Sequence, residues 1–323
     1  MSENDWHGKP YYSLNAYFQN TYGHKCYKAA LNAHMTCPNR DGTLGWRGCI
    51  FCSEGGSGDF AVDASRKSMG QQIEEGLALI RRKLSGSALA ENGAPYIVAY
   101  FQAYTNTYAP VERLRPLFSQ ALSHPLVCGI SIATRPDCLP DGVLKLLSSL
   151  RADFPEKFIW VELGLQTIHE KTALFIRRGY ELPCFENAVH RLSALEIPVI
   201  VHIILGLPGE SSSQMLETVD YISRLSPFGV KLQLLHVLKG TDLAEYYNGG
   251  TFEVLTREAY LDLLMQCLRR LSPQIVVHRL TGDGPKKLLL APLWSGDKRG
   301  VLNELHRLMR ERGCRQGDDF RAE

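Results

Sequence analysis

The amino-acid sequence predicts an α/β protein built on a parallel sheet, in the form of an open or partial barrel. Short apolar runs typical of buried strands recur along the chain, and most are followed by a helical pattern. After the first interval these runs start about 30 residues apart, the length of a strand plus a crossover helix. Most of them end at a polar or glycine-rich turn. Strands and helices that alternate in this way predict a parallel sheet covered by helices.

Six runs are expected as strands and six segments as helices. The strands are Ala29–Ala33, Tyr96–Phe101, Val127–Ala133, Phe158–Leu163, Val199–Leu205 and Val230–Leu235. The helices are Ser65–Leu84, Val111–Ser123, Asp141–Leu150, His169–Phe175, Cys184–Leu195 and Ser211–Leu225. A closed (β/α)8 barrel needs two more such units, so a partial (β/α)6 barrel is the expected form. Functional residues should gather at the carboxyl ends of its strands.

The pattern changes after Leu235. Glu258–Leu271 is expected as a long helix, Gln274–Arg279 as one more strand, and Val301–Arg312 as a terminal helix. We therefore expect an N-terminal extension at residues 1–25, a core at 26–240, and a small α/β C-terminal extension at 241–323 that packs on the core.

The composition is that of an ordinary globular protein. The 323 residues are 45% hydrophobic and 22% charged, with a formal net charge of +2. This charge gives no general argument for nucleic-acid binding, although a local basic face stays open. Residues 1–12 lack the apolar stretch of a signal peptide, and no apolar run approaches the roughly 18 residues of a membrane span. We therefore expect a cytoplasmic protein with no membrane partner.

A cluster of cysteines near the N-terminus is the strongest chemical signal. Cys37, Cys49 and Cys52 have the spacing C-x11-C-x2-C, and glycines between them let the loop curl tightly. Soft thiolates favour iron–sulfur clusters, zinc or copper(I). Zinc remains an alternative, with Cys26, His24 or His34 as a fourth ligand. Three cysteines on one loop instead fit a [4Fe-4S] cluster with one open iron.

Three cysteines that end in Cys-x-aromatic-Cys directly after a first strand resemble the radical SAM superfamily. The long first gap resembles its Elongator-type branch, and the further motifs resemble the YtqA/YhcC-like group, including MnmL-like tRNA enzymes. These motifs are Thr36-Cys-Pro-Asn-Arg-Asp-Gly-Thr43, Tyr100-Phe-Gln-Ala-Tyr-Thr-Asn-Thr107, Thr134-Arg-Pro-Asp137, Glu162-Leu-Gly-Leu-Gln-Thr167, Arg178-Gly179 and Gly206-Leu-Pro-Gly-Glu210.

The resemblance implies a partial (β/α)6 barrel, a [4Fe-4S] cluster on Cys37, Cys49 and Cys52, and S-adenosylmethionine (SAM) as the second cofactor. It also implies a flavodoxin- or ferredoxin-type reductant. The residues that it places at SAM are Phe51, Thr105, Glu162, Gln166, Arg178, His202 and Gly206. The common Gly-Gly pair after the second strand is missing here, which leaves Gln102, Thr105 and Asn106 as polar groups at that position.

Several of these residues also have simpler interpretations. His202 is typical of a satisfied core histidine, and Arg178 of a solvated helix end beside Arg177. Arg135 is expected either to clamp an anion or to pair locally with Asp137. A carboxylate such as Glu162 in an apolar strand needs a partner if it is buried.

The YtqA-like branch is associated with maturation of the tRNA wobble uridine, from a carboxymethylaminomethyl to an aminomethyl side chain. The sequence therefore predicts a tRNA-modifying radical SAM enzyme. A radical SAM enzyme for a small metabolite or peptide is one alternative, and a zinc-stabilised RNA-binding protein is another. For a tRNA substrate, Tyr104, Tyr108, Trp294 and His278 are candidates to stack on a base. Basic candidates to meet phosphates are Arg81-Arg82-Lys83, Arg269-Arg270 and Lys286-Lys287.

Overall fold

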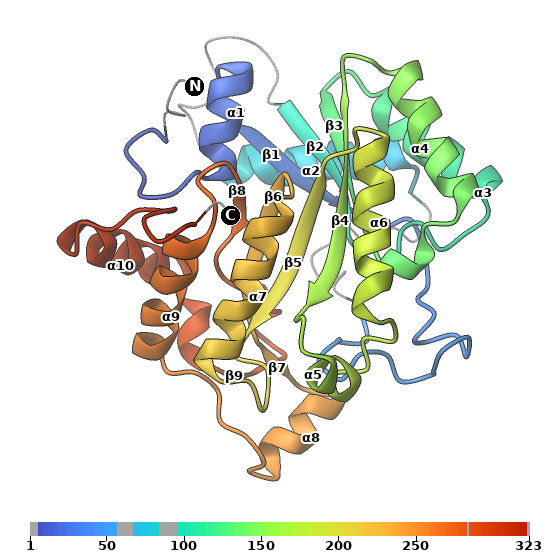
Figure 1. Ribbon diagram of the computed structural model, residues 1–323. Helices are drawn as coiled ribbons and strands as arrows, with labels where there is room; N and C mark the ends of the chain where they lie inside the picture. Colours follow the sequence, from blue (N-terminus) through green and yellow to red (C-terminus); the bar gives the residue numbers. More distant parts are fainter. Residues whose placement is uncertain (1–5, 57–66, 84–95, 283, 322–323) are drawn as a thin grey trace.

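The computed structural model describes residues 6–56, 67–83, 96–282 and 284–321 (Figure 1). Its main element is a sheet of seven parallel strands in the order β1-β2-β3-β4-β5-β6-β8, curled into a half-barrel. The strands are β1 (Cys26–Leu31), β2 (Tyr96–Phe101), β3 (Val127–Thr134), β4 (Phe158–Gln166), β5 (Val199–Leu205), β6 (Gly229–Leu234) and β8 (Val276–Arg279). The six predicted strands and the suggested additional one are confirmed, and the partial barrel with them.

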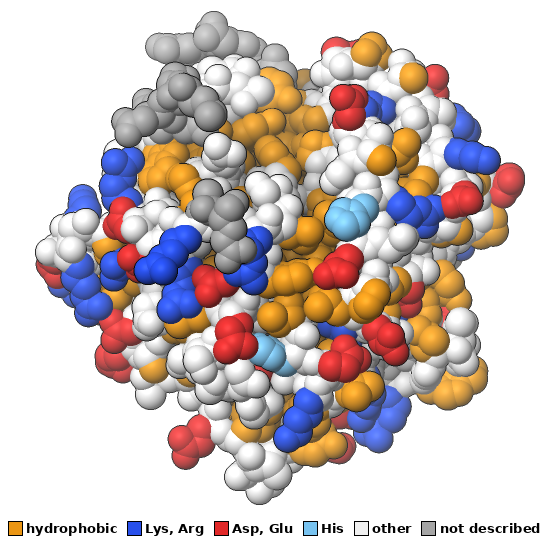
Figure 2. All heavy atoms as spheres, viewed as in Figure 1, with side chains coloured by type: hydrophobic (Ala, Val, Ile, Leu, Met, Phe, Trp, Pro, Cys, Tyr) orange, Lys and Arg blue, Asp and Glu red, His pale blue; other side chains and the backbone are white. Residues whose placement is uncertain are grey.

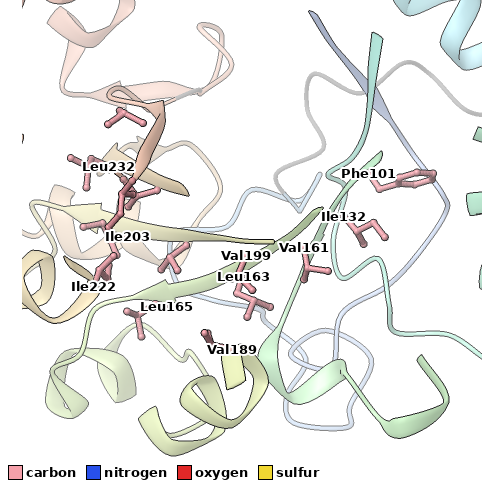
Figure 3. Packing of buried hydrophobic residues seen from close by; sticks show 14 of the residues in the cluster. Phe101, Ile132, Val161, Leu163, Leu165, Val189, Val199, Ile203, Ile222 and Leu232 are labelled. Atoms are coloured by element: carbon pink, nitrogen blue, oxygen red, sulfur yellow. The ribbon is translucent and has the colours of Figure 1, made fainter. Parts of the chain in front are cut away.

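Helices cover the outer face of the sheet, as the alternating pattern predicts. They are α2 (Met69–Lys83), α3 (Val111–Leu122), α4 (Asp141–Asp153), α6 (Leu182–Ala194) and α7 (Ser212–Leu225), with α5 (Glu170–Phe175) after β4. Each expected helix lies within a few residues of its predicted bounds, and positions 65, 66 and 84 of the first one lie outside the described residues. Strand and helix side chains such as Val161, Leu163, Val189 and Ile222 pack together in this layer (Figure 3).

The C-terminal segment also contributes to the sheet. It holds α8 (Asp242–Asn248), α9 (Arg257–Arg270) and α10 (Lys298–Glu311), and a small antiparallel pair of β7 (Val237–Leu238) with β9 (Leu289–Ala291). Strand β8 pairs in parallel with β6, so Lys231 of β6 is the register partner of Arg279 of β8. The segment beyond residue 240 is therefore continuous with the barrel through β8.

Helix α1 (Leu14–Tyr22) is an element that the sequence pattern missed. Ser13 caps it through a hydrogen bond from the Ala16 amide (3.2 Å), and Gly23 ends it with a φ of 74°. In Figure 1 this helix lies at the end of the sheet opposite to α5 and α8.

Helix α1 contributes Phe18 to a layer of apolar side chains inside the barrel, which we call the floor of the barrel. The floor consists of Phe18, Cys26, Val98, Cys128, Trp160 and Ile200. Trp160 stacks on Phe158 with ring centroids 4.0 Å apart, and Phe18 lies 5.8 Å from Trp160. The floor therefore fills the barrel at the amino ends of its strands and leaves the carboxyl ends for a site.

No helix among the described residues is long and apolar enough to cross a membrane.

Candidate active site

The cysteine-bearing segment follows β1 and folds into a loop held by its own backbone. The amide of Arg40 donates to the carbonyl of Cys37 (2.8 Å), and the amide of Gly48 to the carbonyl of Asn39 (2.7 Å). Gly48 has a φ of 74°, and a Cβ at this position would lie 2.7 Å from the Arg40 side chain. Glycine is required here both by the backbone angle and by the close approach.

All three predicted ligand cysteines line one cavity of about 640 Å³, together with Phe51. The Asn39 side chain donates to Sγ of Cys49 (3.4 Å). A hydrogen bond from Cys52, aided by the positive charge of Arg135, lowers the pKa of Cys49 to about 7 against the effect of burial. The same hydrogen bond, together with burial, raises the pKa of Cys52 well above its usual range. Of this pair, Cys49 is therefore the one that favours the thiolate, the form that binds metal.

The fourth ligands considered for zinc, Cys26, His24 and His34, are not among the described residues that line this cavity. Cys26 lies in the floor beside Cys128. The three thiols fit a four-iron cube that leaves one iron without a protein ligand.

Gln166 occupies a strained position at the carboxyl end of β4. Its φ is 66°, and the pairing of β4 with β5 shifts register between Gly164 and Gln166. A Cβ at Gly164 would lie 2.6 Å from Nε2 of Gln166, so glycine allows this side chain to fold back. Its Oε1 is buried without a hydrogen-bond partner in the structure, and the residue lines the cavity. An unsatisfied amide and local strain are typical of a ligand site, and they fit the predicted contact with SAM.

Thr105 is buried and also lines the cavity, and its amide donates to the carbonyl of Thr36 (3.2 Å). Asn106 of the same turn instead donates to the carbonyls of Phe101 (3.1 Å) and Ala133 (3.0 Å). Of the polar groups proposed there, Thr105 and Gln102 face the cavity, while Asn106 connects strands β2 and β3.

Arg178 is almost fully buried, at 2% exposure, and is not a solvated helix end. Its guanidinium donates to the carbonyls of Thr167 (2.8 Å) and Tyr180 (2.8 Å) and to Glu170 (3.1 Å). These bonds tie the end of β4 to α5 and to the following loop. Arg178 lines the cavity, and its predicted contact with SAM stays a prediction.

Arg135 makes the local pair that was one of its two interpretations. Its guanidinium donates to both carboxylate oxygens of Asp137 (2.9 and 2.7 Å) and lies 5.1 Å from the centre of the Tyr180 ring. Arg135 also lines the cavity beside the thiols.

Glu162 lies at the centre of a buried polar layer between the floor and the thiols. Its Oε1 accepts from Lys28 (2.8 Å) and Ser131 (2.6 Å), and its Oε2 accepts from Lys231 and bonds to Nε2 of His202 (2.7 Å). Burial alone would raise the pKa of Glu162, but Lys231, Lys28 and His202 hold it well below its usual range. We call Lys28, Tyr100, Ser131, Glu162, His202 and Lys231 the polar layer.

Sequence reasoning missed most of this layer. It identified Glu162 and His202, but not Lys28, Tyr100, Ser131 or Lys231. The ammonium of Lys231 donates to the hydroxyl of Tyr100 (3.0 Å) and lies 4.5 Å from the centre of its ring. A lysine within an apolar strand carries the same signal that singled out Glu162, so Lys231 was detectable.

His202 has the hydrogen bond expected of a core histidine and also lines the cavity, and its predicted contact with SAM stays a prediction. Its imidazole bonds to Glu162, as a core histidine would, yet the side chain is 15% exposed and lines the cavity. Burial, together with the charge of Lys231, lowers the pKa of His202 to about 4. The imidazole is therefore neutral at physiological pH.

Gly206 lies in the expected tight turn, with a φ of 89°. A Cβ there would lie 3.2 Å from the side chain of Leu255, and Gly206 is not among the described residues that line the cavity. Its predicted contact with SAM stays a prediction.

The candidates for base stacking separate into two groups. Tyr104 lines the cavity, and Tyr108 bonds to Thr43 of the cysteine loop (2.9 Å). Trp294 instead donates to the carbonyl of Leu255 (3.1 Å) and packs on a neighbouring ring. The ring nitrogens of His278 are buried, with its ring between those of Trp160 and Phe228. Trp294 and His278 are half-buried against neighbouring rings and are not among the described residues that line the cavity, and their stacking on a base stays a prediction.

Comparison with known proteins supports what this geometry implies. Residues 42–222 match the model of the radical SAM superfamily, and residues 227–311 match the radical SAM C-terminal domain. The chain is 42% identical to the YtqA protein of Bacillus subtilis over 97% of its own length and 93% of that protein. It is 24% identical to a tRNA uridine(34) acetyltransferase of Methanocaldococcus jannaschii, over 58% of this chain and 33% of that one.

The fold is similar to that of a solved archaeal Elp3 from Methanocaldococcus infernus. The TM-score is 0.63 at 16% sequence identity, with 90% of this chain and 64% of that chain covered. Radical SAM proteins use a [4Fe-4S] cluster and SAM. With its three-thiol loop, its half-barrel and these matches, the chain belongs to the radical SAM superfamily and, within it, to the YtqA/YhcC family.

Proposed function

We propose that this radical SAM enzyme modifies the wobble uridine of tRNA, converting a carboxymethylaminomethyl side chain into an aminomethyl one. The observation that carries the chemistry is the convergence of Cys37, Cys49 and Cys52 with the unsatisfied amide of Gln166 in one cavity. The tRNA assignment is supported by a more distant relative named for its action on uridine 34 of tRNA, and by the resemblance of the sequence motifs to the branch associated with wobble uridine maturation.

The three thiolates would hold the cluster, and Gln166, Thr105 and Phe51 would hold SAM beside it. When bound, these cofactors supply a 5′-deoxyadenosyl radical that removes hydrogen from an unactivated carbon. Such chemistry suits the proposed reaction, because ordinary acid–base side chains do not remove hydrogen from the carboxymethyl carbon. SAM would be the two-electron oxidant overall. Loss of a hydrogen atom and then of a second electron and a proton would give an imine between the nitrogen and the carboxymethyl carbon, and water would hydrolyse it to the aminomethyl group and glyoxylate.

The residues of the chain contribute the surroundings of that reaction. Arg40 donates to the carbonyls of Cys52 (3.1 Å) and Ser53 (2.7 Å) and so fixes the end of the cysteine loop. The floor excludes water from the base of the barrel. The polar layer presents ammonium and imidazole groups toward the cavity, where a substrate would meet them.

The proposal is tested by anaerobic incubation of the loaded protein with SAM, a reductant and tRNA from a host strain that lacks the gene, followed by nucleoside mass analysis. We expect carboxymethylaminomethyluridine to decrease and aminomethyluridine to increase. A Cys49→Ala protein serves as the control and should leave the nucleosides unchanged. Identical nucleosides with and without wild-type protein would exclude the tRNA assignment. A small molecule or peptide would then become the leading substrate class.

A further inference from the structure

Trp46 of the cysteine loop carries the most exposed of the large hydrophobic side chains that the structure describes, at 77%. Trp46 is not among the described residues that line the cavity, so neither the cluster nor SAM explains it. Isolated hydrophobic side chains are common on protein surfaces, and exposure by itself therefore indicates little. The informative features are how the ring is held and what surrounds it.

One face of the Trp46 ring is covered by the backbone of Gly42. A Cβ at Gly42 would lie 2.4, 2.7 and 2.9 Å from three adjoining atoms of the ring. Because the three distances are so similar, the glycine lies over a face of the ring and not at its edge. The exposure of the side chain then comes mostly from the opposite face. Trp46 therefore presents one flat apolar face to the solvent.

The turn that carries the ring is fixed by several hydrogen bonds. The amide of Gly42 donates to the carbonyl of Gly45 (3.1 Å). The carboxylate of Asp41 accepts from the amide of Thr43 (3.1 Å). The hydroxyl of Thr43 bonds to that of Tyr108 (2.9 Å), which anchors the turn to the segment after β2. A ring held in this way loses little conformational freedom on binding, and this favours affinity.

The ring lies close to the cavity. Gly48, two residues after Trp46, lines the cavity, so the two Cα atoms are at most about 7 Å apart. An enzyme that acts on a base must draw it out of the stack, and its contacts with the flanking nucleotides help to select the substrate. With the wobble uridine in the cavity, a flanking base would lie beside the entrance, in reach of Trp46.

Two arginines accompany the ring. Arg47 is exposed and donates to Asp242 (2.5 Å), and Arg177 donates to the other oxygen of the same carboxylate. One carboxylate therefore compensates two guanidinium groups. The carbonyl of Arg177 accepts from the side chain of Asn39 (2.7 Å), which places this second arginine against the cysteine loop. Guanidinium groups bind phosphates through paired hydrogen bonds, so these arginines suit the backbone of RNA.

The surroundings of the ring favour a nucleic-acid base over a protein as its partner. A stable protein interface buries about 800 Å² on each side, with several apolar side chains at its centre. Trp46 lies in the sequence between Gly45 and Arg47, and Cδ1 of Leu44 lies against Gly179 instead. A single ring with one open face matches a single base.

Stacking also suits the charge distribution of the molecule. Figure 2 shows a face on which acidic and basic side chains are intermixed, and the formal net charge of the chain is only +2. This face offers no uniform basic surface for RNA, so local contacts have to contribute more of the affinity. Base–aromatic stacking is such a contact.

We infer that Trp46 is the platform on which a base next to the wobble uridine stacks, with Arg47 and Arg177 beside the phosphates of the same strand. This inference rests on the proposed function and identifies residues that hold the anticodon loop while the wobble uridine is in the cavity. Stacking reads no base identity, because every base has an aromatic face. The platform would therefore serve tRNAs that differ in the flanking nucleotides.

The platform is tested with the loaded enzyme and a fluorescently labelled anticodon stem–loop RNA that carries carboxymethylaminomethyluridine, with binding measured by anisotropy. Trp46→Ala and Trp46→Leu should weaken binding roughly fivefold to hundredfold, the effect of one lost base–aromatic stack. Trp46→Phe should keep most of the affinity because it keeps a ring. Leu293→Ala is the matched control, because it removes a side chain of similar exposure, 73%, outside the described cavity lining. Equal losses in the Leu and Phe variants would overturn the platform.

Removal of the stacked base identifies the partner of the ring. Two further stem–loops each lack one base, that of the nucleotide before or after the wobble uridine. With the wild type, one of these RNAs should bind about as weakly as the intact RNA binds to Trp46→Ala. With Trp46→Ala the same base removal should cause no further loss, because the ring and the base act as one pair. Additive losses for both RNAs would contradict stacking on a flanking base.

Conversion of tRNA is measured separately, so the platform and the proposed function can fail independently. If the wild type converts no tRNA but the losses are non-additive, the platform stands and the proposed reaction fails. If the wild type converts tRNA and Trp46→Ala binds the stem–loop equally well, the platform is overturned and the function stands.

Two further outcomes would also overturn the platform. Loss of iron in Trp46→Ala would make the ring a structural part of the cysteine loop. Normal SAM cleavage by Trp46→Ala with dithionite, but not with reduced flavodoxin, would assign the ring to docking of the reductant.

Discussion

The floor and the polar layer are built on the same strands, yet they are stabilised in opposite ways. On β4, Trp160 of the floor and Glu162 of the polar layer are two residues apart and point to the same side, and both are 1% exposed. Trp160 is surrounded by aromatic rings, with centroids of Phe158, Phe18 and Phe228 at 4.0, 5.8 and 5.0 Å. Glu162 is surrounded by donors instead. Two residues along the same face of one strand therefore separate a packed apolar layer from a cluster of mutually compensated charges.

This difference separates two tasks of the barrel interior. The floor is stabilised by apolar area removed from water and fixes the curvature of the sheet. The polar layer is stabilised only as a complete set, because the loss of one member leaves another charge buried without compensation. A complete set of this kind places charged groups in the cavity, which an apolar core could not do.

The largest contrast is expected between two cysteines, one at each end of the interior. Cys49→Ala should abolish SAM cleavage and reduce the iron content from about four per chain, because one of three thiolate ligands is lost. Cys128→Ala, in the floor, should keep both the iron and the activity. Iron analysis and detection of 5′-deoxyadenosine after anaerobic reconstitution measure the outcome. Full SAM cleavage by the Cys49→Ala protein would contradict the cluster assignment.

The next contrast compares neighbours on β4 by urea unfolding. Glu162→Gln should lower the free energy of unfolding by about 3–5 kcal/mol, because Lys28 and Lys231 then lack a counter-charge. Trp160→Ala should lower it by a similar amount through the cavity that it leaves. A second change, Lys231→Met, should restore stability only in the Glu162→Gln background. If it fails to do so, the polar layer is not stabilised by charge compensation.

The stability of the fold should depend on pH through two histidines that line the cavity, His236 and His202. The lowered pKa of His236, about 4 against 6.5, means that the unfolded chain takes up a proton first as the pH falls. Stability should therefore decrease between about pH 6.5 and 4, by up to about 3 kcal/mol from this residue. His202 acts in the same direction. In urea unfolding at pH 7 and pH 5, His236→Gln should reduce this decrease, whereas the exposed His190→Gln should not. Equal slopes in all three proteins would show that His236 does not titrate as the structure implies.

The smallest effect concerns the strained end of β4. Gln166→Ala should weaken SAM binding up to about tenfold, the value of a hydrogen bond or less, with the cluster spectrum unchanged. Gln166→Gly should weaken it equally while relieving the positive φ, so its stability should match or exceed that of the Ala variant. Spectroscopic SAM titration and thermal unfolding measure the two quantities. Wild-type SAM affinity in both variants would move the SAM site away from Gln166.

The sequence predicted those features that depend on local pattern. The strands were visible because their apolar runs are buried, and Cys37, Cys49 and Cys52 because spacing on one loop determines which thiols can meet. Of the polar layer, the sequence indicated only Glu162 and His202. Lys28 and Lys231 reach Glu162 across separations of 134 and 69 residues. Such contacts depend on strand register and barrel curvature, which no single segment specifies.

Short elements and packed aromatics account for the remaining differences. Strands β7 and β9 have two and three residues, too few to show a period. The side chains of Trp294 and His278 could pack either on a base or on other side chains of the protein. The sequence pattern does not distinguish these two positions, because they depend on the three-dimensional packing. Helix α1 did carry a signal, with Ser13 before it and Gly23 after it.

Beneath the floor, hydrogen bonds join residues near the beginning of the sequence to residues near its end. The amide of Tyr12 donates to the Gln316 side chain (2.9 Å), the amide of Gln316 donates to the carbonyl of Pro10 (2.9 Å), and the amide of Val277 donates to the carbonyl of Tyr12 (2.7 Å). Tyr12 and Gln316 are 304 positions apart. During synthesis on the ribosome, the segment that carries α1 emerges before the strands of the barrel, but its partner segment around Gln316 emerges after them.

Contacts of such long range form late, because the loop between them must close before they stabilise anything. The base of the barrel is therefore sealed late in folding, and until then Trp160 and its neighbours form an exposed apolar surface of the kind that chaperones bind.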